Sequence, residues 1–306
     1  MKKTIVSFAL LLLLLLPGCS NTPVSSSGRF TVVTTTYPVY LLTQMVTEGV
    51  DDVRIMTIIN QPISCPHDYS VTVSDMKTAE QADLLIQNGL GLEPFLSDLL
   101  DAYPDLPVID SSSGISILPY QGHDADQGEG DPHIWMDPNR AAQMVETIGI
   151  GLAEADPTNR ETYEQNAAAA AQTLREYAGT ISGRLANLSC RELITFHDGF
   201  GYLANALNLT IVKSIEEEAG SEVSAKEISN IVSLVKSHGI PAVFCEENGS
   251  ASAANTIAQE AGIRVGTLTL MMNGSEERKT PNLYYTLMDQ NIEVLRKSLQ
   301  TEGGQS

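Results

Sequence analysis

One helical stripe at residues 158–188 constrains the fold more than any other feature of the sequence. Thr158 follows Pro157 and stands three residues before Glu161, a pattern typical of a helix start with a capping box. Apolar or small side chains then recur at steps of three and four residues: Tyr163, Ala167, Ala170, Leu174, Tyr177, Ile181, Leu185 and Leu188. At about 1.5 Å per residue the helix would be on the order of 40 Å long. We therefore expect one long rigid helix that joins two lobes.

Strands and helices alternate on both sides of this stripe. Strands are predicted at residues 29–36, 53–59, 84–87, 108–109, 192–196, 210–212, 242–245 and 265–270. Helices are predicted at residues 37–48, 138–154, 199–207, 224–238, 250–261 and 282–299. The alternation indicates an α/β fold with parallel sheets, divided into an N-terminal lobe (30–157) and a C-terminal lobe (189–306). Because such sheets bind ligands outside the carboxyl ends of their strands, we expect a site in the cleft between the lobes.

The N-terminus has the pattern of an export signal. Two lysines at the start precede an apolar run that is too short to span a membrane, and Pro17-Gly18-Cys19 follows it. This ending resembles a bacterial lipobox, in which the cysteine receives a lipid. We predict a signal peptide at residues 1–18, lipidation of Cys19, and a flexible tether at residues 19–29.

Charge and cysteine content limit the classes of partner. The chain has 18 basic and 38 acidic residues, a formal net charge of −20, which argues against nucleic acid and anionic membrane surfaces as partners. The acidic excess is compatible with a cationic ligand. Apart from Cys19, the chain contains Cys65, Cys190 and Cys245, so at most one disulfide forms within the molecule and at least one thiol does not take part in it.

Three histidines lie in places that suit a metal site. His133 belongs to the segment 131–138, which has prolines at both ends and the only tryptophan, Trp135; the prolines favour a stiff, non-helical strip. His67 and His197 each follow a predicted strand. Neutral imidazole is a good zinc ligand, and three such ligands from two lobes predict a metal site. We interpret His123 as part of a solvated acidic loop and His238 as a histidine at a helix C-terminus.

Several segments together resemble a known family. They are TTTYPVY (34–40), PHDYSVTVSD (66–75), ADLLIQNGLGLEPFL (82–96), DPHIWMDP (131–138), ITFHDGFGYLA (194–204) and VFCEENGSASAANTIAQEAG (243–262). In this order they resemble the substrate-binding lipoproteins of bacterial ABC importers for zinc and manganese. The resemblance implies that His67, His133 and His197 are the metal ligands and that Zn2+ is the transported ion. Manganese members tend to carry Glu at the position of His197.

The same resemblance implies the partners and the location of the chain. They are a membrane permease with its ATPase, and a lipid anchor on the outer face of the bacterial cytoplasmic membrane or a periplasmic location. We expect a monomer.

The fourth ligand is left open by the sequence. Thr269 occupies the place where the family usually has an Asp, and its hydroxyl is a poor zinc ligand. Water, Glu246 or Cys65 are the alternatives. Glu246 is either a ligand or a group that orients a histidine, and Cys65 is either a thiolate ligand or a small buried residue.

Other classes of function remain open at this point. Three histidines and a water also describe a catalytic zinc, with Glu246 as a general base. No HExxH spacing is present, and we expect no enzyme. The remaining alternatives are a manganese-binding member of the same family and an adhesin.

Overall fold

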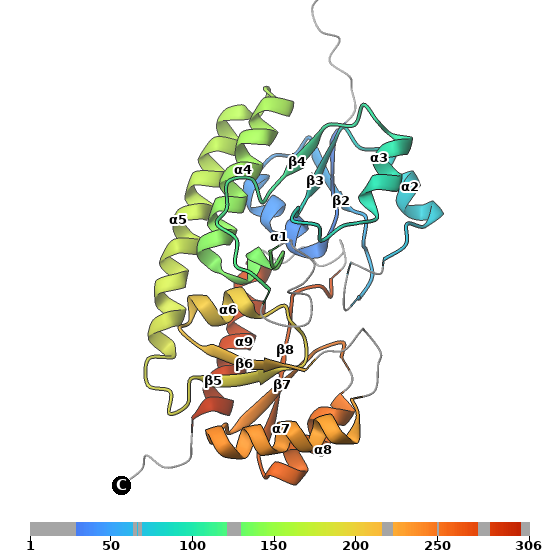
Figure 1. The fold of residues 1–306 in the computed structure, drawn as a ribbon. Coiled ribbons are helices and arrows are strands. Elements are labelled where there is room, and N and C mark those ends of the chain that lie inside the picture. Colours follow the sequence, from blue (N-terminus) through green and yellow to red (C-terminus); the bar gives the residue numbers. More distant parts are fainter. Residues whose placement is uncertain are drawn as a thin grey trace, which may run out of the picture.

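The computed structural model describes residues 29–63, 66, 69–120, 130–215, 223–249, 251–274 and 282–300. Within these ranges none of the helices is both long and apolar enough to cross a membrane. The predicted signal peptide lies outside the described residues, as do Cys19, Cys65, His67 and His123. The described chain forms two lobes, and one long helix runs along one side of both, with a second long helix beside it along the first lobe (Figure 1).

The first lobe is built on a four-stranded parallel sheet with the order β2-β1-β3-β4. Its strands are β1 (Phe30–Thr34), β2 (Val53–Thr57), β3 (Leu84–Gln87) and β4 (Val108–Asp110), and its helices are α1 (Tyr37–Val46), α2 (Val73–Ala79) and α3 (Leu96–Ala102). Successive residues of a strand point to opposite faces. Accordingly, Val32 and Leu84 pack with α1, whereas Val33 and Leu85 pack with α3. Both faces of the sheet are therefore covered by helices, as expected for a parallel sheet.

The second lobe repeats this order as β6-β5-β7-β8, again with all strands parallel. Its strands are β5 (Glu192–Thr195), β6 (Thr210–Ser214), β7 (Ala242–Glu246) and β8 (Arg264–Leu268), and its helices are α6 (Gly201–Ala206), α7 (Ala225–His238), α8 (Ala251–Ala261) and α9 (Leu283–Leu299). All eight strands lie where the sequence predicts them. The α/β fold with two parallel sheets is confirmed.

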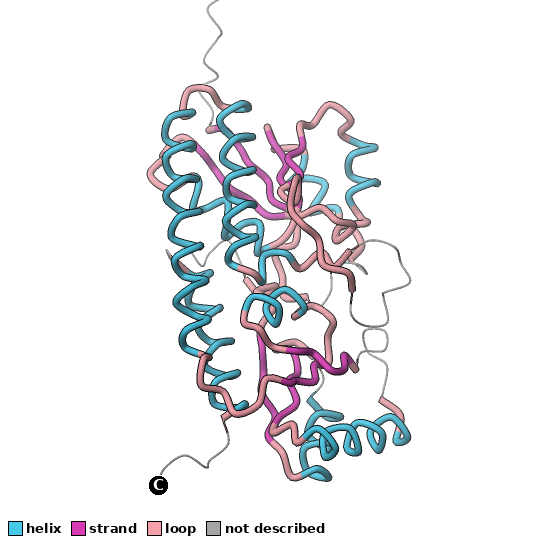
Figure 2. The backbone as a smooth tube through the Cα atoms, turned by 60° about the vertical axis from the view of Figure 1, so that its left-hand side comes forward, coloured by secondary structure: helices cyan, strands magenta, loops and turns pink. Residues whose placement is uncertain are grey.

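Two long helices, α4 (Pro138–Ala155) and α5 (Arg160–Arg184), form a hairpin in which α4 lies along the first lobe and the longer α5 continues to the second (Figure 2). α4 starts as expected for a proline in the first turn: Asp137 Oδ1 accepts a hydrogen bond from the Asn139 N–H at 2.9 Å. The predicted capping box at Thr158 is wrong, because α5 begins at Arg160 with Asn159 as its N-cap residue. Asp156 organises this turn instead: its Oδ2 accepts hydrogen bonds from the Asn159 amide and from the Tyr163 hydroxyl, both at 2.8 Å.

The lobes share one apolar core at their junction. A single cluster of buried side chains includes Leu84 of the first sheet, Trp135, Leu174 of α5, Phe244 of the second sheet and Met288 of α9. Two smaller clusters lie on the outer faces, under α2 and α3 in one lobe and under α7 and α8 in the other. Because apolar packing is continuous across the junction, separating the lobes would expose core side chains to water. The junction is therefore a stiff part of the molecule.

Each sheet has one topological switch point, where the order of the strands reverses. It lies between β1 and β3 in the first lobe and between β5 and β7 in the second. Loops that follow these strands are the usual ligand sites of open parallel sheets. Residues 88–93 and His197 lie in such loops.

Candidate metal-binding site

Two of the three predicted ligands lie in the described part of the chain. His133 directly precedes a short 3-10 helix, η3 (Ile134–Met136), ahead of α4, and His197 follows β5. Both are nearly buried, at 3% and 9% exposure. His67 and Cys65 lie outside the described residues, so their roles stay predictions. Within the described ranges no group of three or more His, Cys, Asp or Glu side chains gathers as a metal cluster.

The rings of His133 and His197 lie next to each other at the junction in an edge-to-face contact. Their centroids are 5.4 Å apart, and the ring planes are nearly perpendicular at 88°. Two imidazoles bound to one tetrahedral zinc at Zn–N distances of about 2 Å have centroids roughly 5 Å apart. The observed centroid separation is therefore close to that of two ligands of a single zinc ion.

Asp131 holds the far side of the His133 ring. Its Oδ1 lies 2.8 Å from Nδ1 of His133 and accepts a second hydrogen bond, at 2.9 Å, from the His133 backbone N–H. An ionised carboxylate only accepts hydrogen bonds, so the contact assigns the ring proton to Nδ1. Nε2 then keeps its lone pair for a metal, an arrangement common among histidine ligands. Gly201 makes the approach of α6 feasible, because a Cβ there would lie 2.8 Å from Asp131 Oδ2.

Glu246 has a similar place beside His197. β5 and β7 run parallel with Thr195 opposite Phe244, and two residues further on the same register brings His197 beside Glu246. Oε2 of Glu246 lies 3.9 Å from Nδ1 of His197, and the glutamate is 5% exposed. The distance is that of an ion pair and is too long for a hydrogen bond. The carboxylate thus faces the same ring nitrogen that Asp131 holds in His133.

Thr269 is buried just past β8, and its hydroxyl has a local role. Oγ1 accepts a hydrogen bond from the Met271 N–H at 3.0 Å, and Asn291 of α9 binds both the N–H and the carbonyl of Thr269 at 2.8 Å. Met271 has a φ of 62°, so the turn is strained and needs such support. Next in the chain, the Leu270 side chain lies close to Gly199, as does that of His197: a Cβ on Gly199 would lie 2.8 Å from each.

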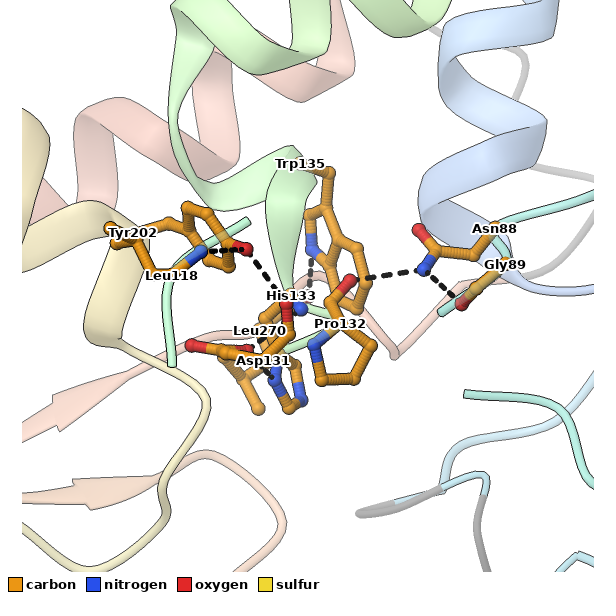
Figure 3. A network of polar contacts seen from close by, with 9 residues as sticks. All are labelled: Asn88, Gly89, Leu118, Asp131, Pro132, His133, Trp135, Tyr202 and Leu270. Atoms are coloured by element: carbon orange, nitrogen blue, oxygen red, sulfur yellow. Dashed lines mark hydrogen bonds and ion pairs between the residues drawn. The ribbon is translucent and has the colours of Figure 1, made fainter. Parts of the chain in front are cut away.

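The segment that holds His133 is fixed from several directions (Figure 3). From the second lobe, the Tyr202 hydroxyl donates to the Asp131 carbonyl at 2.8 Å, and the Trp135 indole donates to the Leu270 carbonyl at 3.0 Å. From the first lobe, the Asn88 amide donates to the Pro132 carbonyl at 3.0 Å. Hydrogen bonds from both lobes therefore fix the backbone segment that carries His133.

Sequence reasoning missed Asp131, Asn88, Glu93 and Asn291. Asp131 carries a local signal, since an acid two residues before a histidine in a proline-rich strip suits a carboxylate–histidine pair. The sequence of residues 88–92 does not predict a contact with the His133 segment, and nothing local distinguishes Asn291 on α9. Two free thiols, Cys190 and Cys245, lie in the described part of the chain.

Two parallel-sheet lobes, a long helical hairpin and two adjacent histidines at the junction define a two-lobed binding protein. The family model "Zinc-uptake complex component A periplasmic" matches residues 32–298, and the chain belongs to this family.

Individual relatives agree with this assignment. Zinc-binding lipoprotein AdcA of Streptococcus pneumoniae (strain ATCC BAA-255 / R6) is 30% identical over 315 residues, which cover 99% of this chain and 62% of AdcA. The chain thus spans about three fifths of that relative's length. Iron-binding protein YfeA of Yersinia pestis is 27% identical over 280 residues, covering 90% of this chain and 88% of YfeA.

Solved structures confirm the two-lobed fold. The crystal structure of ZnuA superposes with a TM-score of 0.77 at 27% identity, covering 89% of this chain and 100% of that one. Zn(II)-bound AdcA from Streptococcus pneumoniae superposes with a TM-score of 0.76 at 28% identity, covering 90% of this chain and 59% of that one.

Proposed function

We propose that the chain captures Zn2+ outside the cytoplasm and delivers it to an ABC importer. The observation that carries the proposal is the 5.4 Å separation of the His133 and His197 rings, with Asp131 behind the first. His133 and His197 bind the ion through Nε2, and His67 supplies a third imidazole. Membership of the zinc-uptake family and the zinc-binding names of the AdcA relatives support the choice of ion.

The donor set favours zinc over manganese. Imidazole nitrogens suit zinc, whereas manganese prefers carboxylate, carbonyl and water oxygens. Glu246 faces Nδ1 of His197, which supports an orienting role, and the Thr269 hydroxyl accepts the Met271 N–H. We therefore propose that water or Cys65 completes the coordination, and that neither Glu246 nor Thr269 does.

Delivery requires further parts that lie outside this chain or outside the described residues. We propose residues 1–18 as a signal peptide, lipidation of Cys19 and a tether at 19–29. The lobes at 30–157 and 189–306 are then joined by a linking segment at 158–188, of which residues 160–184 form α5. A permease with its ATPase receives the ion from the monomeric protein. Hydrolysis and adhesion, the other sequence-based alternatives, are not favoured by the family model or by the AdcA relatives.

Zinc titration of the metal-free protein, with a chromophoric chelator as competitor, tests the proposal. We expect one zinc per chain and a large loss of affinity in each of His67→Ala, His133→Ala and His197→Ala. His238→Ala is the matched control, because His238 lies at the end of α7 and pairs with Glu192 at the opposite end of the sheet. Stoichiometric binding that survives all three substitutions would overturn the proposal.

A further inference from the structure

The loop after β3 is strained and lies next to the His133 segment. Gly89, Leu90 and Gly91 have consecutive φ values of 89°, 58° and 74°, and Leu90 is not a glycine. A non-glycine residue in this region is strained and persists only where the surroundings enforce it. At Gly89 a Cβ would lie 2.2 Å from Asp110 Oδ1, so only glycine fits there. The loop therefore needs a group that holds it in shape.

The buried carboxylate of Glu93 is that group. Oε1 accepts hydrogen bonds from the Asn88 N–H at 2.7 Å and from the Thr35 hydroxyl at 2.6 Å, and Oε2 accepts one from the Gly89 N–H at 3.1 Å. Glu93 is 6% exposed. Because a buried carboxylate is costly unless hydrogen-bonded, the contacts stabilise both the acid and the loop around it.

Asn88 connects this loop to the histidine. Its side-chain amide donates to the Pro132 carbonyl at 3.0 Å and to the Gly89 carbonyl at 3.1 Å (Figure 3). The Pro132 carbonyl and the His133 N–H belong to one peptide plane. Asn88 holds the carbonyl end of that plane, and Asp131 Oδ1 holds the N–H end at 2.9 Å. The direction in which the His133 side chain leaves the backbone is thereby fixed.

We propose that Asn88, set in place by Glu93, is a positioning residue that aims His133 at the ion. This inference rests on the proposed zinc function. Asn88 does not touch the metal; it acts through the orientation of the peptide before the ligand. Groups that orient a metal ligand typically contribute about 10- to 100-fold in affinity.

Asn88→Leu tests the proposal, because leucine keeps the approximate volume and removes both donated hydrogen bonds. Ser111→Ala is the matched control: the Ser111 hydroxyl donates to the Gln87 and Asn88 carbonyls of the same loop, at 2.8 and 3.3 Å, and does not contact Pro132. We expect zinc affinity to fall about 10-fold or more in Asn88→Leu and to stay within about twofold in Ser111→Ala. Asn88→Asp, with nearly identical shape, replaces Asn88→Leu if the latter does not fold.

A readout without metal separates this inference from the proposed function. Nitrogen NMR of 15N-histidine-labelled, metal-free protein reports which ring nitrogen of His133 carries the proton. We expect the Nδ1–H form in wild type and Ser111→Ala, and a mixture of tautomers in Asn88→Leu. Zinc affinity within twofold of wild type together with an unchanged tautomer in Asn88→Leu would overturn the positioning role. Absence of zinc binding in wild type would instead overturn the proposed function, and the positioning role with it.

Discussion

The two lobes use a buried glutamate differently at equivalent places. Each sheet has a nearly buried glutamate associated with its third strand: Glu93 shortly after β3, and Glu246 as the last residue of β7. Glu93 accepts hydrogen bonds from the backbone of its own loop. Glu246 faces the Nδ1 of His197 on the neighbouring strand. One acid supports a loop, and the other lies beside a candidate ligand.

The difference follows from the length of the chain between the strand and the acid. Five residues separate the end of β3 from Glu93, and their glycines let the backbone N–H groups turn inward toward the carboxylate. Glu246 is still part of β7, so the parallel register of β7 with β5 places it beside His197. The repeated topology therefore places a buried glutamate near the carboxyl end of the third strand in each lobe. The local chain determines which group its carboxylate contacts.

The largest effect on stability is expected at Glu93. Burial raises the pKa of Glu93 to about 7, while the hydrogen bonds from Thr35, Asn88 and Gly89 act in the opposite direction. The folded protein then retains a proton that an unfolded glutamate, with a pKa of about 4.3, has released. Stability therefore falls as pH rises from about 4.3 to about 7, by about 4 kcal/mol in total.

Glu93→Gln removes this titration. Urea unfolding at pH 5 and pH 8 should show a smaller fall in unfolding free energy for Glu93→Gln than for wild type. Glu154→Gln, at an exposed position of α4, is the control and should keep the wild-type dependence. An equal fall in wild type and Glu93→Gln would show that the acid is ionised throughout.

At Glu246 in the second lobe we expect a large effect on zinc affinity and a small effect on stability. Glu246→Gln weakens the polarisation of His197, and we expect zinc affinity to fall about 10- to 100-fold. Chelator competition measures the affinity, and urea unfolding of the metal-free protein should change much less than in Glu93→Gln. Glu247→Gln, at the exposed neighbouring position, is the control. If Glu246→Gln binds zinc with wild-type affinity, Glu246 does not contribute to the site.

The parts of the fold that depend on local periodicity could be predicted from the sequence. The continuous apolar run of β7 and the stripe of α5, with its steps of three and four residues, are both visible in the sequence. The capping box at Thr158 failed because Asp156 binds the same turn, a competition that the pattern does not reveal. Contacts such as Asn88 to Pro132 and Trp135 to Leu270 join residues 44 and 135 positions apart, so only the folded chain shows them.

A smaller loss of stability is expected at Thr35, which belongs to the Glu93 cluster. Its hydroxyl donates to Glu93 at 2.6 Å between buried groups. Thr35→Val keeps the shape but deprives the carboxylate of one donor, which costs about 1–3 kcal/mol. Urea unfolding at pH 8 measures the loss. In the double variant Thr35→Val/Glu93→Gln the two effects on stability should not add, because both changes act on the same contact; simple additivity would contradict the pairing.

Thr195, at the end of β5, provides the counterpart with the smallest effect. It is fully buried like Thr35, but among the described residues its hydroxyl oxygen has no hydrogen-bond partner. A buried hydroxyl without a partner is unfavourable, so Thr195→Val should leave stability unchanged or raise it by up to about 1 kcal/mol. Urea unfolding of Thr195→Val beside Thr35→Val checks the sign. A loss as large as that of Thr35→Val would mean that the second lobe also binds this hydroxyl. Opposite signs would show that the Thr35 hydroxyl stabilises the first lobe through Glu93, whereas the Thr195 hydroxyl does not stabilise the second.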